Sequence, residues 1–184
     1  MQLEKLTVKS REALLAAQNY ATLKNHQAIT PLHLLHGILT VEESLIGNIL
    51  QLLNCNVAGI IADCQQTLEK LPAVYGNSNI YFDKACERIF TLAENLAKNL
   101  KDEFISLEHI YLALLEQNDS STATLVNKYN LNKQAFIKEL QKIKTEPIAS
   151  EDPENRYNAL KKYGFDLVEQ AKKQKLDPFI CSES

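Results

Sequence analysis

Histidines are the first residues in this sequence whose spacing could support chemistry. His33 and His36 are one helical turn apart and His26 precedes them; histidines at that spacing share a helix face and could ligate a metal ion. No carboxylate or thiol joins them at a regular spacing. His33 instead has a counterpart in His109, and each of these two comes three residues after a Thr or Ser that is a favourable helix N-cap. A side chain at that position can bond back to the cap, so we predict capping roles and neither a metal site nor a catalytic one.

Motifs for phosphate chemistry and nucleophilic catalysis are missing from the sequence. It has no G-x-x-x-x-G-K-[ST] segment to hold a triphosphate and no G-x-S-x-G turn to expose a serine. The cysteines form no CxxC pair and have no histidine at zinc-finger spacing; they are Cys55, Cys64, Cys86 and Cys181. We therefore predict that this chain is not an enzyme, that it hydrolyses no ATP by itself, and that it holds no cofactor or metal.

The charge and hydropathy of the chain restrict its partners and its compartment. Charged residues make up 23% of the chain and their net charge is −3, whereas a nucleic-acid binder needs an excess of lysine and arginine. No apolar run approaches the roughly eighteen residues of a membrane span. The N-terminus carries charges where a secretory signal would be apolar. We expect a cytoplasmic protein with reduced thiols and with neither a nucleic-acid nor a membrane partner.

The elements that must position these residues are predicted to be helices. Apolar residues recur at three- and four-residue spacing, for example through residues 3–21 and 60–71, and no segment alternates convincingly with period two. Pro, Gly and Asn predict a loop at 71–79. Residues 144–155 carry two prolines, several acids and few apolar side chains. This composition predicts a flexible linker that proteases would cut, followed by a further helix.

A duplication organises the chain up to residue 143. The phrases "ITPLHLLHGIL", which begins at Ile29, and "ISLEHIYLALL", which begins at Ile105, are offset by 105 − 29 = 76 residues, and matches continue at that offset without a gap. Breaks between helices are expected near 28, 41 and 55 and again near 104, 117 and 131. We predict an all-α fold of eight helices, built from a four-helix repeat at about 1–70 and another at about 80–143, related by a pseudo-twofold axis. The repeated phrase would be the central helix of each half, packed where the halves meet.

The repeated phrases resemble the paired signatures of the Clp amino-terminal domain family. "LEKLPAVYG" is similar to the loop between repeats in ClpB-type disaggregase chaperones, and "NALKKYGFDLVEQAKKQKLDPFI" resembles the entry to the first AAA+ ATPase module of ClpB and ClpC. The resemblance implies an amino-terminal domain at 1–143, a linker at 144–155 and the start of an AAA+ module at 156–184. It also implies a monomeric isolated domain within a longer stress-response ATPase. That protein would use ATP and Mg, form a homohexamer and cooperate with a DnaK-type chaperone.

The same resemblance supplies candidate site residues. Thr7, Asp102 and Glu108 match a Thr, an Asp and a Glu that rim a hydrophobic groove for unfolded polypeptide in ClpB-like proteins. The repeat counterparts of the two acids are His26 and Leu32, so the shared scaffold requires neither charge, and we expect the acids to be exposed. The alternatives are structural: an exposed helix residue for the threonine, a solvated loop acid, and a carboxylate favoured in the first turn of a helix.

A second, smaller match lies near the end of the sequence. Phe179 and Ile180 match the hydrophobic pair that packs against adenine in the family, which implies a nucleotide contact in the longer protein. Cys181 and Ser182 stand where the family usually has Gly and Arg.

Three functions are compatible with these observations. The favoured one is a domain that recognises exposed apolar segments of unfolded or aggregated proteins, for threading by an AAA+ ring; its affinity should be weak because a disordered client loses conformational entropy on binding. The second is an adaptor-docking domain, as in ClpA and ClpC unfoldases, and the third is a structural repeat that binds neither. The "LPAVYG" segment favours the first.

Overall fold

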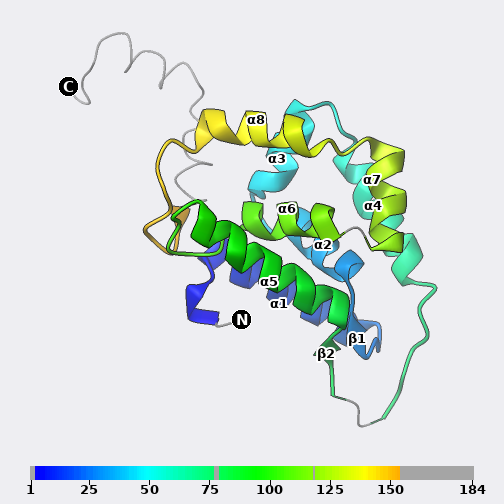
Figure 1. The fold of residues 1–184 in the computed structure, drawn as a ribbon. Helices are drawn as coiled ribbons and strands as arrows, with labels where there is room; N and C mark the ends of the chain where they lie inside the picture. The colour runs from blue at the N-terminus through cyan, green and yellow to red at the C-terminus, as the bar shows by residue number, and fades with distance from the viewer. Residues whose placement is uncertain (1–2, 77–78, 118, 154–184) are drawn as a thin grey trace, which may run out of the picture.

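The computed structural model describes residues 3–76, 79–117 and 119–153, and these fold into two copies of one helical unit (Figure 1). A short 3-10 helix, η1 (Leu3–Lys5), comes first. The first unit then has α1 (Val8–Leu23), α2 (Pro31–Thr40), α3 (Leu45–Leu52) and α4 (Val57–Leu68). The second has α5 (Lys84–Asn99), α6 (Leu107–Gln117), α7 (Ser120–Tyr129) and α8 (Lys133–Ile143). The predicted eight-helix fold and its helix breaks are therefore confirmed in the described residues.

Individual helix caps and turns occur at equivalent positions in the two units. The side chains of Thr7 and Asp83, which are 76 residues apart, accept hydrogen bonds from the backbone N–H three residues later at the starts of α1 and α5. Asn54 and Asn130 are another such pair, and both have left-handed backbones with φ of 63° and 52°. Asparagine tolerates this conformation better than most residues, so the repeated asparagines mark equivalent turns.

Two short backbone pairings join the units crosswise. β1 (Ala28–Ile29) of the first unit pairs in parallel with β2 (Tyr81–Phe82) of the second. Leu6 of the first unit forms a matching parallel bridge with Ile105 of the second. These strands are a small departure from the all-helical prediction, because two residues are too few to produce a visible alternation in the sequence.

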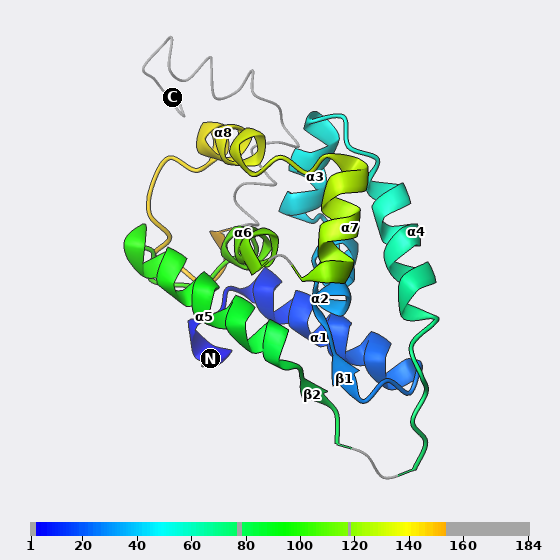
Figure 2. The same cartoon turned by 45° about the vertical axis from the view of Figure 1, so that its right-hand side comes forward.

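The central helices of the units meet in the interior, as predicted. α2 and α6 contact each other and lie in the middle of the molecule in both views (Figures 1 and 2). Every residue of α2 from Pro31 to Leu39 is buried. Residues 71–76 are exposed and belong to a loop that projects from one end, in agreement with the loop prediction (Figure 2). None of the described helices is both long and apolar enough to cross a membrane.

Candidate functional site

Each unit contains a histidine that caps its central helix, as the spacing predicted. The backbone N–H of Thr30 donates to Nδ1 of His33 over 2.9 Å, and that of Ser106 donates to Nδ1 of His109 over 2.9 Å. Because Nδ1 accepts in both cases, the ring proton of each neutral histidine lies on Nε2. What this Nε2–H meets differs between the units, and this difference defines the candidate site.

In the first unit, the partner of the capping histidine is another histidine. Nε2 of His33 lies 2.9 Å from Nδ1 of His26, and both residues are buried. Burial, together with the neighbouring His26 and His36, lowers the pKa of His33 to about 4. Burial also lowers the pKa of His26. The charge of Glu69 opposes this shift at His26 without overcoming it. Within the described residues, neither histidine forms an ion pair with a carboxylate, so a further proton on this pair would be poorly compensated.

This arrangement predicts an acid-sensitive first unit. The folded-state pKa of His33 is below its unfolded value of about 6.5, so the unfolded chain binds more protons and stability falls as the pH drops from about 6.5 to 4. His26→Asp should flatten this loss, since it gives protonated His33 a carboxylate partner. His26→Asn removes a histidine without adding charge and should retain the loss. Urea unfolding of the three proteins at several pH values measures the effect; equal slopes in all three would contradict it.

In the second unit, the corresponding partner is Asp102. Nε2–H of His109 donates to Oδ2 of this carboxylate over 2.8 Å, Lys144 Nζ also donates to Oδ2, and the Ile148 backbone N–H donates to Oδ1 over 2.7 Å. Burial alone would raise the pKa of Asp102, but these three hydrogen bonds hold it below the usual value. Asp102 is therefore a buried, charged anchor, and its predicted exposure is wrong.

Glu108 is the more unusual acid. Its carboxylate is fully buried and accepts no hydrogen bond within the described part of the chain, although Oε2 lies 3.3 Å from Lys144 Nζ. Its repeat counterpart, Leu32, is also buried. One lysine thus faces two carboxylates, and an unsatisfied buried carboxylate has a large desolvation cost. The predicted exposure of Glu108 is wrong because the scaffold places this helix position inside the protein.

Thr7 is buried as well, and it has a clear structural role. Its Oγ1 accepts a hydrogen bond from the Ser10 backbone N–H over 3.3 Å and donates to Ser10 Oγ over 3.0 Å, which caps α1. The backbone N–H of Thr7 donates to the carbonyl of Ile105 over 3.0 Å. In the sequence, Ile105 lies between Asp102 and Glu108. The structural alternative for Thr7, an exposed helix residue, is therefore wrong.

Residues 144–152, which we call the strap, contact Asp102 and Glu108 directly and reach Val8, the residue after Thr7. Its Ile148 is only 2% exposed, although it lies outside the main cluster of core side chains. The Ile148 carbonyl accepts from Glu103 N–H over 2.7 Å, and the Glu151 carbonyl accepts from Val8 N–H over 2.6 Å. The flexible linker at 144–155 stays a prediction, and Ile148 is an apolar anchor within it. α8 ends at Ile143, where the predicted domain ends.

The strap residues that complete the site were not predicted from the sequence. Lys144 and Ile148 lie four positions apart in a stretch classified by its prolines and acids. A lone aliphatic residue among polar ones was the available signal, but it carried no indication of what it would contact. Phe179 and Ile180 lie outside the described residues.

The chemistry available at this site is recognition by charge and hydrogen bonds. Among the described residues, no group of three or more His, Cys, Asp or Glu is arranged to hold a metal ion. Cys55, Cys64 and Cys86 are free thiols. A separate cleft of about 580 Å³ in the first unit is lined by Tyr20, Lys24, Ala62, Gln65, Gln66 and Glu69, none of which was predicted as a site residue.

Comparisons with known proteins agree with the duplicated fold. The family model of the Clp repeat (R) N-terminal domain matches residues 5–129. The chaperone protein ClpB of Clostridium tetani is 38% identical over 185 residues, covering 98% of this chain and 21% of that protein. ClpB of Nitratidesulfovibrio vulgaris is 33% identical over 186 residues, with 98% and 22% coverage. The chain thus spans about a fifth of the length of these curated relatives.

Solved structures share the fold at low sequence identity. The Hsp104 N-terminal domain from Candida albicans superposes with a TM-score of 0.70 at 17% identity, covering 80% of this chain and 97% of that one. The N-terminal domain of ClpD from Arabidopsis thaliana gives a TM-score of 0.58 at 17% identity, with 77% and 97% coverage.

Proposed function

Because the chain belongs to the Clp repeat N-terminal domain family and resembles ClpB chaperones over almost its whole length, we propose that it recognises unfolded polypeptide. The binding site is a groove beside Thr7, Asp102 and Glu108. The longer protein would be a cytoplasmic, homohexameric ATPase that uses ATP and Mg, cooperates with a DnaK-type chaperone and threads the captured chain. The adenine contact of Phe179 and Ile180 would belong to that ATPase.

The observation that carries this proposal is the buried carboxylate of Glu108. It is fully buried and accepts no hydrogen bond from any residue that the structure describes, at a helix position where the first unit has Leu32. Stability alone favours an apolar residue at such a position. Residues that break a local rule without a structural benefit are concentrated at functional sites, so the cost of Glu108 supports a role in binding.

The neighbouring backbone supports the same role. The N–H groups of Val8 and Glu103 point to the strip of surface that the strap covers, where each donates to a carbonyl. A client chain in an extended conformation presents carbonyls at similar intervals, so it could accept these bonds whatever its sequence. Apolar burial, worth roughly 25 cal/mol per Å², would supply most of the free energy, and the acids would favour clients with nearby Lys or Arg.

Titration of a permanently unfolded protein into the full chain tests this function. We expect Glu108→Gln and Asp102→Asn each to weaken binding by about 2 kcal/mol, or roughly thirtyfold, because a client cation would lose a buried charged partner. Thr7→Ala should also weaken it, but this variant loses a helix cap worth about 1 kcal/mol, so circular dichroism and urea unfolding must confirm that it stays folded.

Glu116→Gln is the matched control. Glu116 lies on the same helix as Glu108, is half exposed and pairs with Lys133 over 3.2 Å, so its replacement should leave client binding unchanged. Equal binding by the wild type and the three site variants would remove these residues from the mechanism. Absence of client binding at high concentration, combined with capture of a folded adaptor, would favour the adaptor-docking alternative instead.

A further inference from the structure

The strap has the chemistry of the ligand that the groove is proposed to take. It leaves α8 in an extended conformation at Lys144, with φ −87° and ψ 105°. The strap places the ammonium group of Lys144 against the two carboxylates of the site, and it buries the side chain of Ile148 four residues later. We propose that the strap is an internal ligand of the client groove, and that the groove selects extended segments with Lys or Arg four positions before an aliphatic residue. This inference rests on the proposed function.

The requirement for a Lys or Arg in the client follows from the two acids of the site, which outnumber the single lysine of the strap. Asp102 and Glu108 have fully buried side chains, and the side chain of Lys144 is only 13% exposed. His109 contacts only Asp102 of the two acids, whereas Lys144 faces both of them within the described residues. A client that displaces the strap must supply an equivalent positive charge or leave two carboxylates together in a poorly hydrated site.

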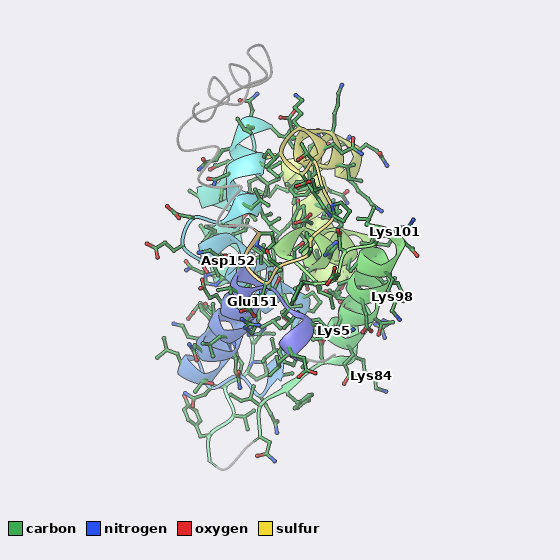
Figure 3. All side chains as sticks on the ribbon, turned by 90° about the vertical axis from the view of Figure 1, so that its left-hand side faces the viewer. Lys5, Lys84, Lys98, Lys101, Glu151 and Asp152 are labelled. Carbon is green, nitrogen blue, oxygen red and sulfur yellow. The ribbon has the colours of Figure 1, made fainter. Side chains whose placement is uncertain are left out.

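The aliphatic position follows from the burial of Ile148 and from its backbone bonds. Its N–H donates to Asp102 and its carbonyl accepts from Glu103, so the main chain is held on both sides of the buried side chain. Figure 3 labels Glu151 and Asp152 farther along the strap, and the Glu151 carboxylate lies 3.4 Å from the Arg11 guanidinium of α1. Both acids are exposed, so the end of the strap lies at the surface and its displacement would not require the core to open.

The first unit indicates that the repeat does not need such an occupant. Its corresponding segment follows α4, and Pro72, the counterpart of Ile148 at the 76-residue offset, is exposed. Val74 in that segment donates a single backbone bond, to the Asn25 carbonyl, over 2.7 Å. The first unit also has His26 and Leu32 in place of the two acids. Within the described residues, the second unit therefore has both the acid pair, Asp102 and Glu108, and a buried strap, whereas the first unit has neither at the corresponding positions.

An internal ligand lowers the apparent affinity for clients, because only the fraction of chains with a displaced strap is competent to bind. Ile148→Asp places a third carboxylate in the site and should release the strap, so we expect it to tighten binding of an unfolded client by about tenfold. Ala149→Asp is the matched control, since it adds the same charge at the next residue, which is exposed, and it should leave the affinity unchanged. Equal affinities of the wild type and Ile148→Asp would overturn the proposal.

Hydrogen exchange at single amides provides a readout that a merely structural strap would not change. Saturation with client should displace the strap, so the Ile148 amide should lose its acceptor Asp102 and exchange faster. The amides of Val8 and Glu103 should stay protected, because the client takes over their acceptors. Client binding that leaves the Ile148 amide protected would show that the client binds elsewhere, and would overturn the proposal.

A peptide added in trans separates this inference from the proposed function. A peptide with the sequence of residues 144–152 should bind the Ile148→Asp chain, and a peptide with Lys144→Glu and Ile148→Asp should not. If the first peptide binds and unfolded clients do not, the groove recognises the strap and the proposed function fails alone. If unfolded clients bind and neither peptide does, the internal-ligand inference fails and the proposed function stands.

Discussion

Replacing Glu108 with leucine is expected to stabilise the protein, raising its free energy of unfolding by about 1–3 kcal/mol. The carboxylate is fully buried and has no hydrogen-bond donor among the residues in the described ranges, and leucine is the residue that the first unit has at this position. Lys144 would keep Asp102 as its counter-charge, so the substitution removes the surplus charge and leaves a balanced pair. Urea unfolding monitored by circular dichroism at neutral pH measures the change.

The reciprocal substitution Leu32→Glu is the control for this prediction. It places a carboxylate in the first unit, where the strap and its lysine are absent, so it should destabilise the protein strongly, by roughly 3 kcal/mol or more. A loss of stability in Glu108→Leu would mean that the contact with Lys144 outweighs the cost of burying the acid. If Glu108→Leu is both more stable and weaker in client binding, the acid is retained for function at the expense of stability.

The second large effect is expected at Gly37, in the middle of α2. A Cβ atom at this position would lie 2.5 Å from the carbonyl oxygen of Ala13 in α1, closer than two such atoms can approach. Backbone cannot move aside as a flexible side chain would, so Gly37→Ala must push α1 and α2 apart. We expect a loss of about 3 kcal/mol, at the upper end for overpacking of a core. Thermal and urea unfolding measure it.

Gly47→Ala provides the matched control, since it makes the same change in another buried helix. A Cβ there would meet its neighbours at 3.7 Å or more, an ordinary contact. Alanine has the higher helix propensity, so this variant should gain up to about 1 kcal/mol. Losses of similar size in both variants would show that the close approach of α1 and α2 is not what Gly37 provides.

Much of the fold could be predicted from the sequence because its determinants are local. Helix periodicity, caps and left-handed turns depend on residues a few positions apart, and the duplication supplied several of these signals twice, such as the caps of α1 and α5. The pair His33 and His109 is an example: the distance to the N-cap is set by the helix itself, so a capping role followed from spacing alone and the structure confirms it. The crosswise pairing of Leu6 with Ile105 left no local signal.

The candidate site was only partly predictable. The sequence and the family resemblance identified Thr7, Asp102 and Glu108, and the repeat showed that neither acid is required by the shared scaffold. They could not show that all three are buried, since burial depends on which distant segment covers a residue. The strap was classified by composition as a linker, and composition does not reveal that one isoleucine finds a buried place.

The sequence by itself therefore determined the helices, their caps, the duplication and the family, because each depends on short-range spacing or on self-similarity along the chain. Only the tertiary structure decided the state of the site. It brought Lys144 to two acids that lie 42 and 36 positions before it in the sequence, and it exchanged an expected exposed rim for a buried charged cluster. The physical reason is that the pKa and the cost of a buried charge depend on its neighbours in space, which the order of residues does not specify.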